Sequence, residues 1–297
     1  MAKPATFSTK IDLSLVDKLK KDLEEKGFSF SYPPYSAFSA KTRGISLTVY
    51  ESGALVCQGK DKDEFIEFYL EPEILKDLTY TNPLSGLDLT PKIGVDEAGK
   101  GDFFGPLCIT SLYADKKGIE ELIKLGVKDS KKISDKKAVD LAKKLKSEFF
   151  TSTLRLFPIK YNELYDKFKN LNRMLAWAHA TVIADLVEKT GCKHALIDKF
   201  GPDSYVENAL KYKNISLNLE QKTKGENDPV VAAASIIARA SFLEGIQTLS
   251  DEVGIELPKG ANNGVIEAGK KLVNKYDNEI LTKACKLHFK TLNQVMN

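Results

Sequence analysis

The chain has 297 residues, of which 42% are hydrophobic and 29% charged, and its formal net charge at pH 7 is only +3. This composition is typical of a folded globular protein with one or two domains, and so small a net charge does not by itself indicate a nucleic-acid partner. No apolar stretch reaches the roughly 20 residues of a membrane span. The N-terminus "MAKPATFSTK" lacks the apolar core of a secretory signal. We therefore expect no association with a membrane.

The first 80 residues predict a small α+β domain. Apolar residues recur at helical spacing in "LSLVDKLKKDLEE", and Gly27 is a suitable end for that helix. The segment "ISLTVYESGALVCQG" predicts two strands joined by a turn. A second helix is expected over about 61–75, with Phe68 on its apolar side. Residues 81–92 contain turn formers without periodicity, so we expect a linker there.

From residue 93 to residue 297 the pattern predicts a second, α/β domain. Strands are expected over 93–98, 107–114, 149–159, 194–198 and 215–221, and helices over 171–189 and from Pro229 onward. Strands that first form a meander and then alternate with helices predict a mixed sheet covered by helices.

The four cysteines give no sign of a zinc site or of disulfides. They are far apart and form no CxxC or Cys/His cluster: Cys57, Cys108, Cys192 and Cys285. Reduced thiols are the better interpretation, and we expect a cytoplasmic protein.

Two of the predicted strands end on carboxylates. In "IGVDEAGKG" the apolar run is followed by Asp96 and Glu97, and in "HALIDKFG" the apolar run is followed by Asp198. If these strands are neighbours, a strand spacing of about 4.8 Å brings Asp96 and Asp198 to one cation. Carboxylate oxygens are suitable ligands for Mg²⁺ or Mn²⁺. The pattern therefore predicts a site for a divalent metal.

Glu97 presents a geometric difficulty. Adjacent residues of a regular strand point to opposite faces, so Asp96 and Glu97 can share a cation only if the strand already turns at Glu97. Taken alone, the stretch is also compatible with a structural turn. A P-loop is excluded because the GxxxxGK[ST] spacing is missing, and a dinucleotide fingerprint is excluded because a strand follows.

Four segments in succession resemble the motifs of the type 2 ribonucleases H. These are "DEAGKGDFFGPL", "KDSKK", "LIDKFG" and "VVAAASIIARASFL". Lysine between the two glycines, and the additional N-terminal domain, resemble the HIII branch; the HII branch usually has arginine there. The resemblance implies a ribonuclease-H-like mixed sheet flanked by helices over 93–297, preceded over 1–80 by a small TATA-binding-protein-like domain that binds substrate.

The resemblance implies an endoribonuclease that hydrolyses the RNA strand of RNA–DNA hybrids with two divalent ions, Mg²⁺ or Mn²⁺. The products would carry 5′-phosphate and 3′-hydroxyl ends. Asp96, Glu97 and Asp198 would be metal ligands. The fourth catalytic carboxylate stays open between Glu226 and Asp228: the HIII branch has glutamate there, which favours Glu226, and Asp228 is already explained as a helix N-cap.

Substrate contacts are also implied by the resemblance. Gly99 and Gly101 would let the backbone approach the 2′-hydroxyl, and Lys100 would lie near a phosphate. Ser130 and Lys131 would contact the nucleic-acid backbone without reading its sequence. In the N-terminal domain the cations that could bind a duplex are Lys41, Arg43, Lys60 and Lys62.

Other residues with chemical potential are expected to be structural. The three histidines, His179, His194 and His288, have no partner at a metal-binding spacing. Ser235 lies in the alanine-rich helix without a histidine base, so we expect it to pack rather than to act as a nucleophile.

Three alternative functions remain. The first is incision at single ribonucleotides embedded in DNA, as in the HII branch. The second is nucleic-acid binding without catalysis, which the carboxylates disfavour because they repel phosphates. The third is another metal-dependent phosphotransferase, which would not explain the full series of motifs. No obligate protein partner is evident, and we expect a monomer.

Overall fold

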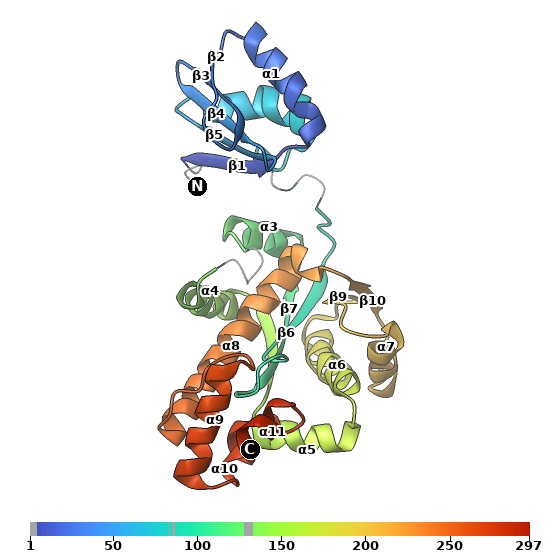
Figure 1. The fold of residues 1–297 in the computed structure, drawn as a ribbon. Coiled ribbons are helices and arrows are strands. Elements are labelled where there is room, and N and C mark those ends of the chain that lie inside the picture. The colour runs from blue at the N-terminus through green and yellow to red at the C-terminus, as the bar shows by residue number, and fades with distance from the viewer. Residues whose placement is uncertain (1–4, 83, 85–86, 128–132) are drawn as a thin grey trace. The chain divides into compact units, whose positions relative to one another are not determined.

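The computed structural model describes residues 5–82, 84, 87–127 and 133–297 (Figure 1). The chain divides into two compact units, Met1–Asp88 and Leu89–Asn297. Each unit has its own sheet and its own hydrophobic core.

The N-terminal unit contains a five-stranded antiparallel sheet with the order β1-β5-β4-β3-β2. Its strands are β1 (Thr6–Lys10), β2 (Ser29–Ser31), β3 (Ser36–Thr42), β4 (Ile45–Tyr50) and β5 (Ala54–Gln58). Its helices are η1 (Leu13–Leu15), α1 (Val16–Glu25), α2 (Lys62–Phe65) and the π-helical segment η2 (Ile66–Leu75). Alternate strand residues such as Leu47 and Val49 are fully buried with Leu19 and Leu23 of α1, so the helices pack on one face of the sheet.

The helix expected over 61–75 is present, but its winding differs from the prediction. Most of it is π-helix, which closes i→i+5 hydrogen bonds and therefore changes which side chains share a face. Ile66, Leu70 and Ile74 are buried, whereas Phe68 is 71% exposed. The predicted burial of Phe68, which assumed α-helical spacing, was wrong.

The second unit contains a five-stranded mixed sheet with the order β10-β9-β6-β7-β8. Its strands are β6 (Lys92–Ala98), β7 (Leu107–Ala114), β8 (Phe150–Leu156), β9 (His194–Asp198) and β10 (Asn218–Lys222). The β6-β7-β8 meander is antiparallel, and β9 and β10 continue the sheet in parallel with β6. The predicted α/β fold class is thereby confirmed.

Helices cover both faces of this mixed sheet (Figure 1). They are α3 (Lys116–Lys124), α4 (Asp135–Glu148), α5 (Pro158–Phe168), α6 (Leu171–Thr190), α7 (Asp203–Tyr212), η4 (Gly225–Asn227), α8 (Pro229–Val253), α9 (Asn263–Tyr276), α10 (Ile280–Ala284) and α11 (Thr291–Met296). Helix α8 packs with α3 and α4 on one side of the sheet, and α6 packs with α7 on the other. The strand predicted over 149–159 ends earlier, because Pro158 opens α5.

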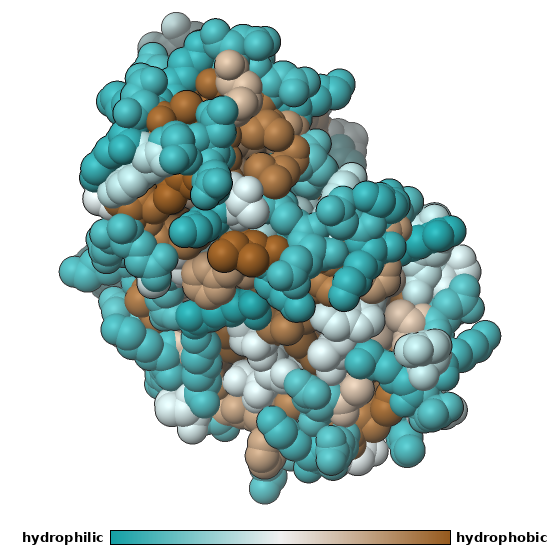
Figure 2. Space-filling view, turned by 90° about the horizontal axis from the view of Figure 1, so that it is seen from below, coloured by the Kyte–Doolittle hydropathy of each residue, from teal (hydrophilic) through white to brown (hydrophobic). Residues whose placement is uncertain are grey.

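Helix α8 lies very close to β6. A Cβ atom added to Gly94 would stand 2.5 Å from the backbone of Val230 and Val231, so only glycine permits this approach. Among the described residues α8 is the one helix long and apolar enough to cross a membrane, but 83% of its apolar window is buried inside the protein. Its apolar character is therefore explained by packing. On the face in Figure 2, hydrophilic residues predominate and hydrophobic residues lie between them, as is ordinary for a protein surface.

Candidate active site

Asp96 and Asp198 lie at the carboxyl ends of two neighbouring parallel strands. The register pairs Val95 of β6 with Ile197 of β9, and the next residue of each strand is one of the two aspartates. Burial, the charge of Glu97 and the charge of Asp198 all raise the pKa of Asp96, to about 7. The prediction that these two strands are neighbours is confirmed. Their pairing brings negatively charged side chains together at one edge of the sheet.

Glu97 is engaged by a different helix from Asp96. Its Oε2 lies 3.1 Å from Nε2 of His179, a fully buried residue of α6, and its Oε1 lies 3.5 Å from Nζ of Lys100. Burial acts to raise the pKa of Glu97, but His179 and Lys100 outweigh burial and hold that pKa below its ordinary value. Asp96 instead hydrogen-bonds with Ser235 of α8.

The strand continues through Glu97 and does not turn there. Glu97 is in register with Ile109 of β7, and Asp96 with Thr110. The alternation of a regular strand thus directs Asp96 toward α8 and Glu97 toward α6. Asp96 and Glu97 remain close enough for their charges to interact.

A divalent cation fits this edge chemically. In the described parts of the chain, no three His, Cys, Asp or Glu side chains are grouped as a ready-made metal site. Asp96 and Asp198 nevertheless offer hard oxygen donors, and a cation would offset the burial and the neighbouring negative charges that together raise the pKa of Asp96. These two aspartates are the residues that would hold the ion first, while Glu97 is bonded to His179 and Lys100.

Asp228 has a structural role. Its Oδ1 accepts hydrogen bonds from the backbone N–H groups of Val230 (2.8 Å) and Val231 (3.4 Å), which caps α8. Its Oδ2 lies 3.0 Å from Nζ of Lys92, a lysine whose side chain is only 6% exposed. Both carboxylate oxygens are thus used by the fold.

Glu226 lies in a short turn against the end of β9. In η4, the N–H of Gly225 donates to Oδ1 of Asp198 at 2.8 Å. A Cβ atom on Gly225 would approach the Cα atom of Asp198 to 2.9 Å, so glycine is needed for this contact. The turn therefore places the backbone next to Glu226 against Asp198, whereas the carboxylate of Asp228 caps α8 and pairs with Lys92.

The two glycines of the glycine loop, Gly99–Gly101, differ in their surroundings. Gly99 has φ +87°, and a Cβ atom there would lie 2.2 Å from the carbonyl oxygen of Pro106. A Cβ atom on Gly101 would meet nothing within 4 Å. Lys100 projects between them, its Nζ lying 5.5 Å from the ring centroid of Phe200. The fold therefore requires Gly99, whereas Gly101 leaves open space that a ligand can use.

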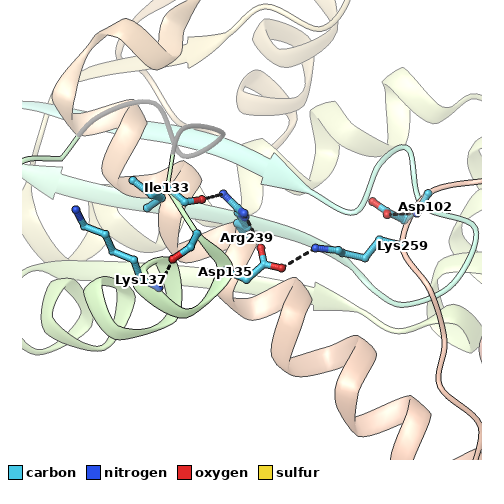
Figure 3. A network of polar contacts seen from close by, with 8 residues as sticks. Asp102, Ile133, Asp135, Lys137, Arg239 and Lys259 are labelled. Atoms are coloured by element: carbon cyan, nitrogen blue, oxygen red, sulfur yellow. Dashed lines mark hydrogen bonds and ion pairs between the residues drawn. The ribbon is translucent and has the colours of Figure 1, made fainter. Parts of the chain in front are cut away.

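A polar network ties the segment after the glycine loop to α4 and α8 (Figure 3). The N–H of Gly260 donates to Oδ1 of Asp102 at 2.6 Å. The neighbouring Lys259 lies 2.7 Å from Asp135, the first residue of α4, and Arg239 of α8 pairs with the same carboxylate. Lys259 and then Arg239 hold the pKa of Asp135 below its ordinary value. The loop is thus anchored to elements far from it in sequence.

Two of the predicted substrate contacts, Ser130 and Lys131, lie outside the residues that the structure describes. The chain is described again from Ile133, and Ser134 caps α4 by accepting the N–H of Lys137 at 3.3 Å.

Three residues near the site were not predicted to have a role there. His179 contacts Glu97, Ser235 bonds Asp96, and the buried Lys286 lies beneath the segment that follows the glycine loop. A single histidine in a helix and a single serine in an alanine-rich helix carry no spacing signal. Packing of α6 and α8 on β6 is what brings them to the carboxylates.

Comparisons with known proteins cover both units. Residues 93–292 match the family described as ribonuclease HII, and residues 6–80 match a domain of unknown function, DUF3378. The chain is 48% identical to ribonuclease HIII of Protochlamydia amoebophila over 98% of this chain and 96% of that protein. It is 47% identical to ribonuclease HIII of Chlamydia felis, with 97% of each chain covered.

Solved structures agree over nearly the full length. Bst-RNase HIII in complex with Mn²⁺ is similar with a TM-score of 0.69 and 27% identity, covering 98% of both chains. RNase H3 of Aquifex aeolicus is similar with a TM-score of 0.58 and 28% identity, covering 96% of this chain and 100% of the other.

Proposed function

The chain belongs to the ribonuclease HII family and, within it, to the ribonucleases HIII, and on that premise we propose that it hydrolyses the RNA strand of RNA–DNA hybrids, leaving 5′-phosphate and 3′-hydroxyl ends. The observation that carries the proposal is the pair of carboxylates at the ends of β6 and β9. Burial, and then the charges of Glu97 and Asp198, raise the pKa of Asp96 to about 7. Such an edge suits cation-dependent phosphodiester hydrolysis.

We assign the metal-binding role to Asp96 and Asp198, with Glu226 as the further catalytic carboxylate. Bound Mg²⁺ or Mn²⁺ would supply charge neutralisation for the scissile phosphate and a more acidic water. The similar Bst-RNase HIII has been crystallised with Mn²⁺, which supports a divalent cation here. Glu97, which contacts His179 and Lys100 on the α6 side of β6, adds negative charge close to Asp96.

Recognition of RNA would come from the glycine loop. The 2′-hydroxyl is what distinguishes the RNA strand, and a backbone amide or carbonyl can reach it only where no side chain intervenes. The open space at Gly101 permits that approach. Lys100, whose side chain is 37% exposed, can meet a phosphate as a point charge.

The N-terminal unit would raise affinity for the duplex. The sheet face opposite α1 carries the half-buried hydroxyl of Thr48, which lies 3.0 Å from the hydroxyl of the buried Ser39 on the neighbouring strand. Lys41 and Arg43 are exposed beside them. Lys62 is buried and paired with Asp63, so it is not available to a duplex as the sequence suggested.

We also propose that the protein is a monomer and is located in the cytoplasm. All four cysteines are buried as free thiols, which suits a reducing compartment.

Cleavage of an end-labelled RNA–DNA hybrid, with and without Mg²⁺ or Mn²⁺, tests the function. We expect cation-dependent cuts within the RNA strand and their loss in Asp96→Asn. Cleavage that persists in Asp96→Asn would refute the metal assignment. A DNA duplex with one embedded ribonucleotide, assayed in parallel, distinguishes the HII-like alternative, because preferred incision there would favour it.

A further inference from the structure

Lys286 is a fully buried lysine beneath the segment that follows the glycine loop. Its side chain comes from the C-terminal part of the chain, between α10 and α11, and its relative exposure is 0%. Its Nζ donates to the carbonyl oxygens of Asp102 (2.8 Å), Gly105 (2.8 Å) and Phe104 (3.4 Å). One ammonium group therefore gathers three carbonyls of a single turn.

An ammonium group is costly to bury, so its presence here requires a compensating interaction. Burial lowers the pKa of Lys286 to about 8, while the charge of Asp102 and the thiols Cys108 and Cys285 act to raise it. The ring of Tyr161 lies 5.6 Å from Nζ, and burial, together with the charge of the nearby Lys286, lowers the pKa of His288. The carbonyl cage is the main polar environment of this ammonium.

The backbone around Lys286 is held independently of its side chain. The N–H of Lys286 donates to the carbonyl of Phe103 at 2.9 Å. Asn162 of α5 donates to the carbonyl of Cys285 at 2.9 Å and accepts the N–H of Leu287 at 3.0 Å. The backbone of residues 285–287 is thus fixed by its own hydrogen bonds, and the ammonium group of Lys286 extends from it to the turn at 102–105.

The turn at 102–105 is continuous with the glycine loop. The N–H of Asp102 donates to the carbonyl of Gly99 at 3.4 Å. Gly105 has φ +82°, and a Cβ atom there would press on Phe242 and Ile246 of α8. The glycine loop and the turn held by Lys286 are thus consecutive in the chain and joined by this hydrogen bond.

We propose that Lys286 is a positioning residue for hybrid binding: its ammonium group, by gathering the carbonyls of the turn at 102–105, fixes the glycine loop in the conformation that approaches the 2′-hydroxyl. This inference rests on the proposed function, because it assigns a support to the loop that reads the RNA strand. A neutral amine keeps only two N–H donors for the three carbonyls and leaves one of them without its partner.

Protonation of Lys286 affects binding and stability in opposite directions. Because burial lowers its pKa from 10.5 to about 8, the unfolded chain binds the additional proton between about pH 8 and pH 10.5. The free energy of unfolding contributed by this group therefore rises with pH in that window. Hybrid affinity should instead fall as the ammonium is lost. A purely structural lysine would not produce this opposition.

The test measures dissociation constants of labelled RNA–DNA hybrid and of DNA duplex of the same sequence. The full chain carries Asp96→Asn to prevent cleavage, and Lys286→Met is compared with Lys283→Met, the same change at an exposed position of α10. We expect Lys286→Met to weaken hybrid binding about tenfold, which is the worth of one charge-assisted hydrogen bond. It should also reduce the preference for hybrid over DNA duplex, whereas Lys283→Met should not.

Binding to the parent chain is also followed from pH 7 to pH 9.5. The preference for hybrid should fall as pH passes about 8, and in Lys286→Met it should not depend on pH in this way. An unchanged preference in folded Lys286→Met overturns the inference. If that variant does not fold, a preference of the parent chain that stays constant with pH overturns it. A parent chain that binds hybrid no better than DNA duplex at pH 7 refutes the proposed recognition of RNA itself, and the inference with it.

Discussion

The carboxylate of Glu97 lies 3.1 Å from the fully buried imidazole of His179. This contact is on the opposite side of β6 from Asp198 and α8. This contact explains how a strand can keep two consecutive acidic residues without turning. Asp96 is directed to the edge shared with Asp198, and Glu97 has its own partner on α6. His179 is therefore expected to act through Glu97.

Replacing His179 should lower the cleavage activity by more than the accompanying loss of folded protein explains. In His179→Ala the carboxylate of Glu97 loses its fixed orientation, and we expect cleavage of hybrid to fall by about 10- to 100-fold. The Mn²⁺ concentration for half-maximal activity should rise. His194→Ala, at an exposed position of β9, is the control. Unchanged activity and an unchanged Mn²⁺ requirement in His179→Ala would show that the contact only fills the core.

Asp96→Asn should stabilise the protein in the absence of divalent cations. Burial and the neighbouring carboxylates raise the pKa of Asp96 from 3.8 to about 7, so its contribution to stability is present below about pH 3.8 and is lost as pH rises through about 7. At pH 8 in EDTA we expect the variant to be more stable by about 1–3 kcal/mol. The difference should shrink at pH 5.

Thermal unfolding at both pH values measures this effect, with Asp140→Asn on the exposed surface of α4 as control. Adding Mn²⁺ should raise the Tm of the wild type more than that of Asp96→Asn, because the ion binds only the folded state. If the wild type is more stable than Asp96→Asn in EDTA at pH 8, burial and the neighbouring carboxylates do not destabilise the ionised Asp96.

Glu226 and Asp228 should separate into a catalytic and a structural carboxylate. Asp228→Asn keeps a capping oxygen but removes the negative charge that lies 3.0 Å from the buried ammonium of Lys92, so the free energy of unfolding should fall by about 1–3 kcal/mol. Glu226→Gln should fold normally and retain less than about one hundredth of the activity. Urea unfolding measures the stability of both variants, and hybrid cleavage measures their activity. If Glu226→Gln loses stability and Asp228→Asn loses activity, the two roles are exchanged.

Alanine at the two glycines of the glycine loop should have different effects. Gly99→Ala forces a Cβ atom to within 2.2 Å of the Pro106 carbonyl at φ +87°, and we expect a loss of about 2 kcal/mol or more in stability. Gly101→Ala has room, so stability should change by less than about 0.5 kcal/mol. Its Michaelis constant for hybrid should rise about tenfold, the equivalent of one hydrogen bond. Normal hybrid kinetics in Gly101→Ala would place recognition of the 2′-hydroxyl elsewhere.

The sequence alone determined the local features of this protein. Apolar runs that end on Asp96 and Asp198 predicted two strands with carboxylates at their ends, and Asp228 before Pro229 predicted the start of α8. These signals are local, because a strand period or a helix cap is complete within a few consecutive residues. The four motifs identified the type 2 ribonucleases H, and Lys100 together with the additional N-terminal domain identified the HIII branch, which the relatives confirm.

The tertiary structure alone decided the partners of the charged groups. His179 is 82 residues from Glu97, and Lys286 is 184 residues from Asp102, so no periodicity links either pair. The winding of η2, which exposes Phe68, likewise differs from what α-helical spacing predicted. A buried charge is stable only where the fold supplies its partner, and the packing of α6 on β6 and of the C-terminal segment beneath the glycine loop supplies the partners here.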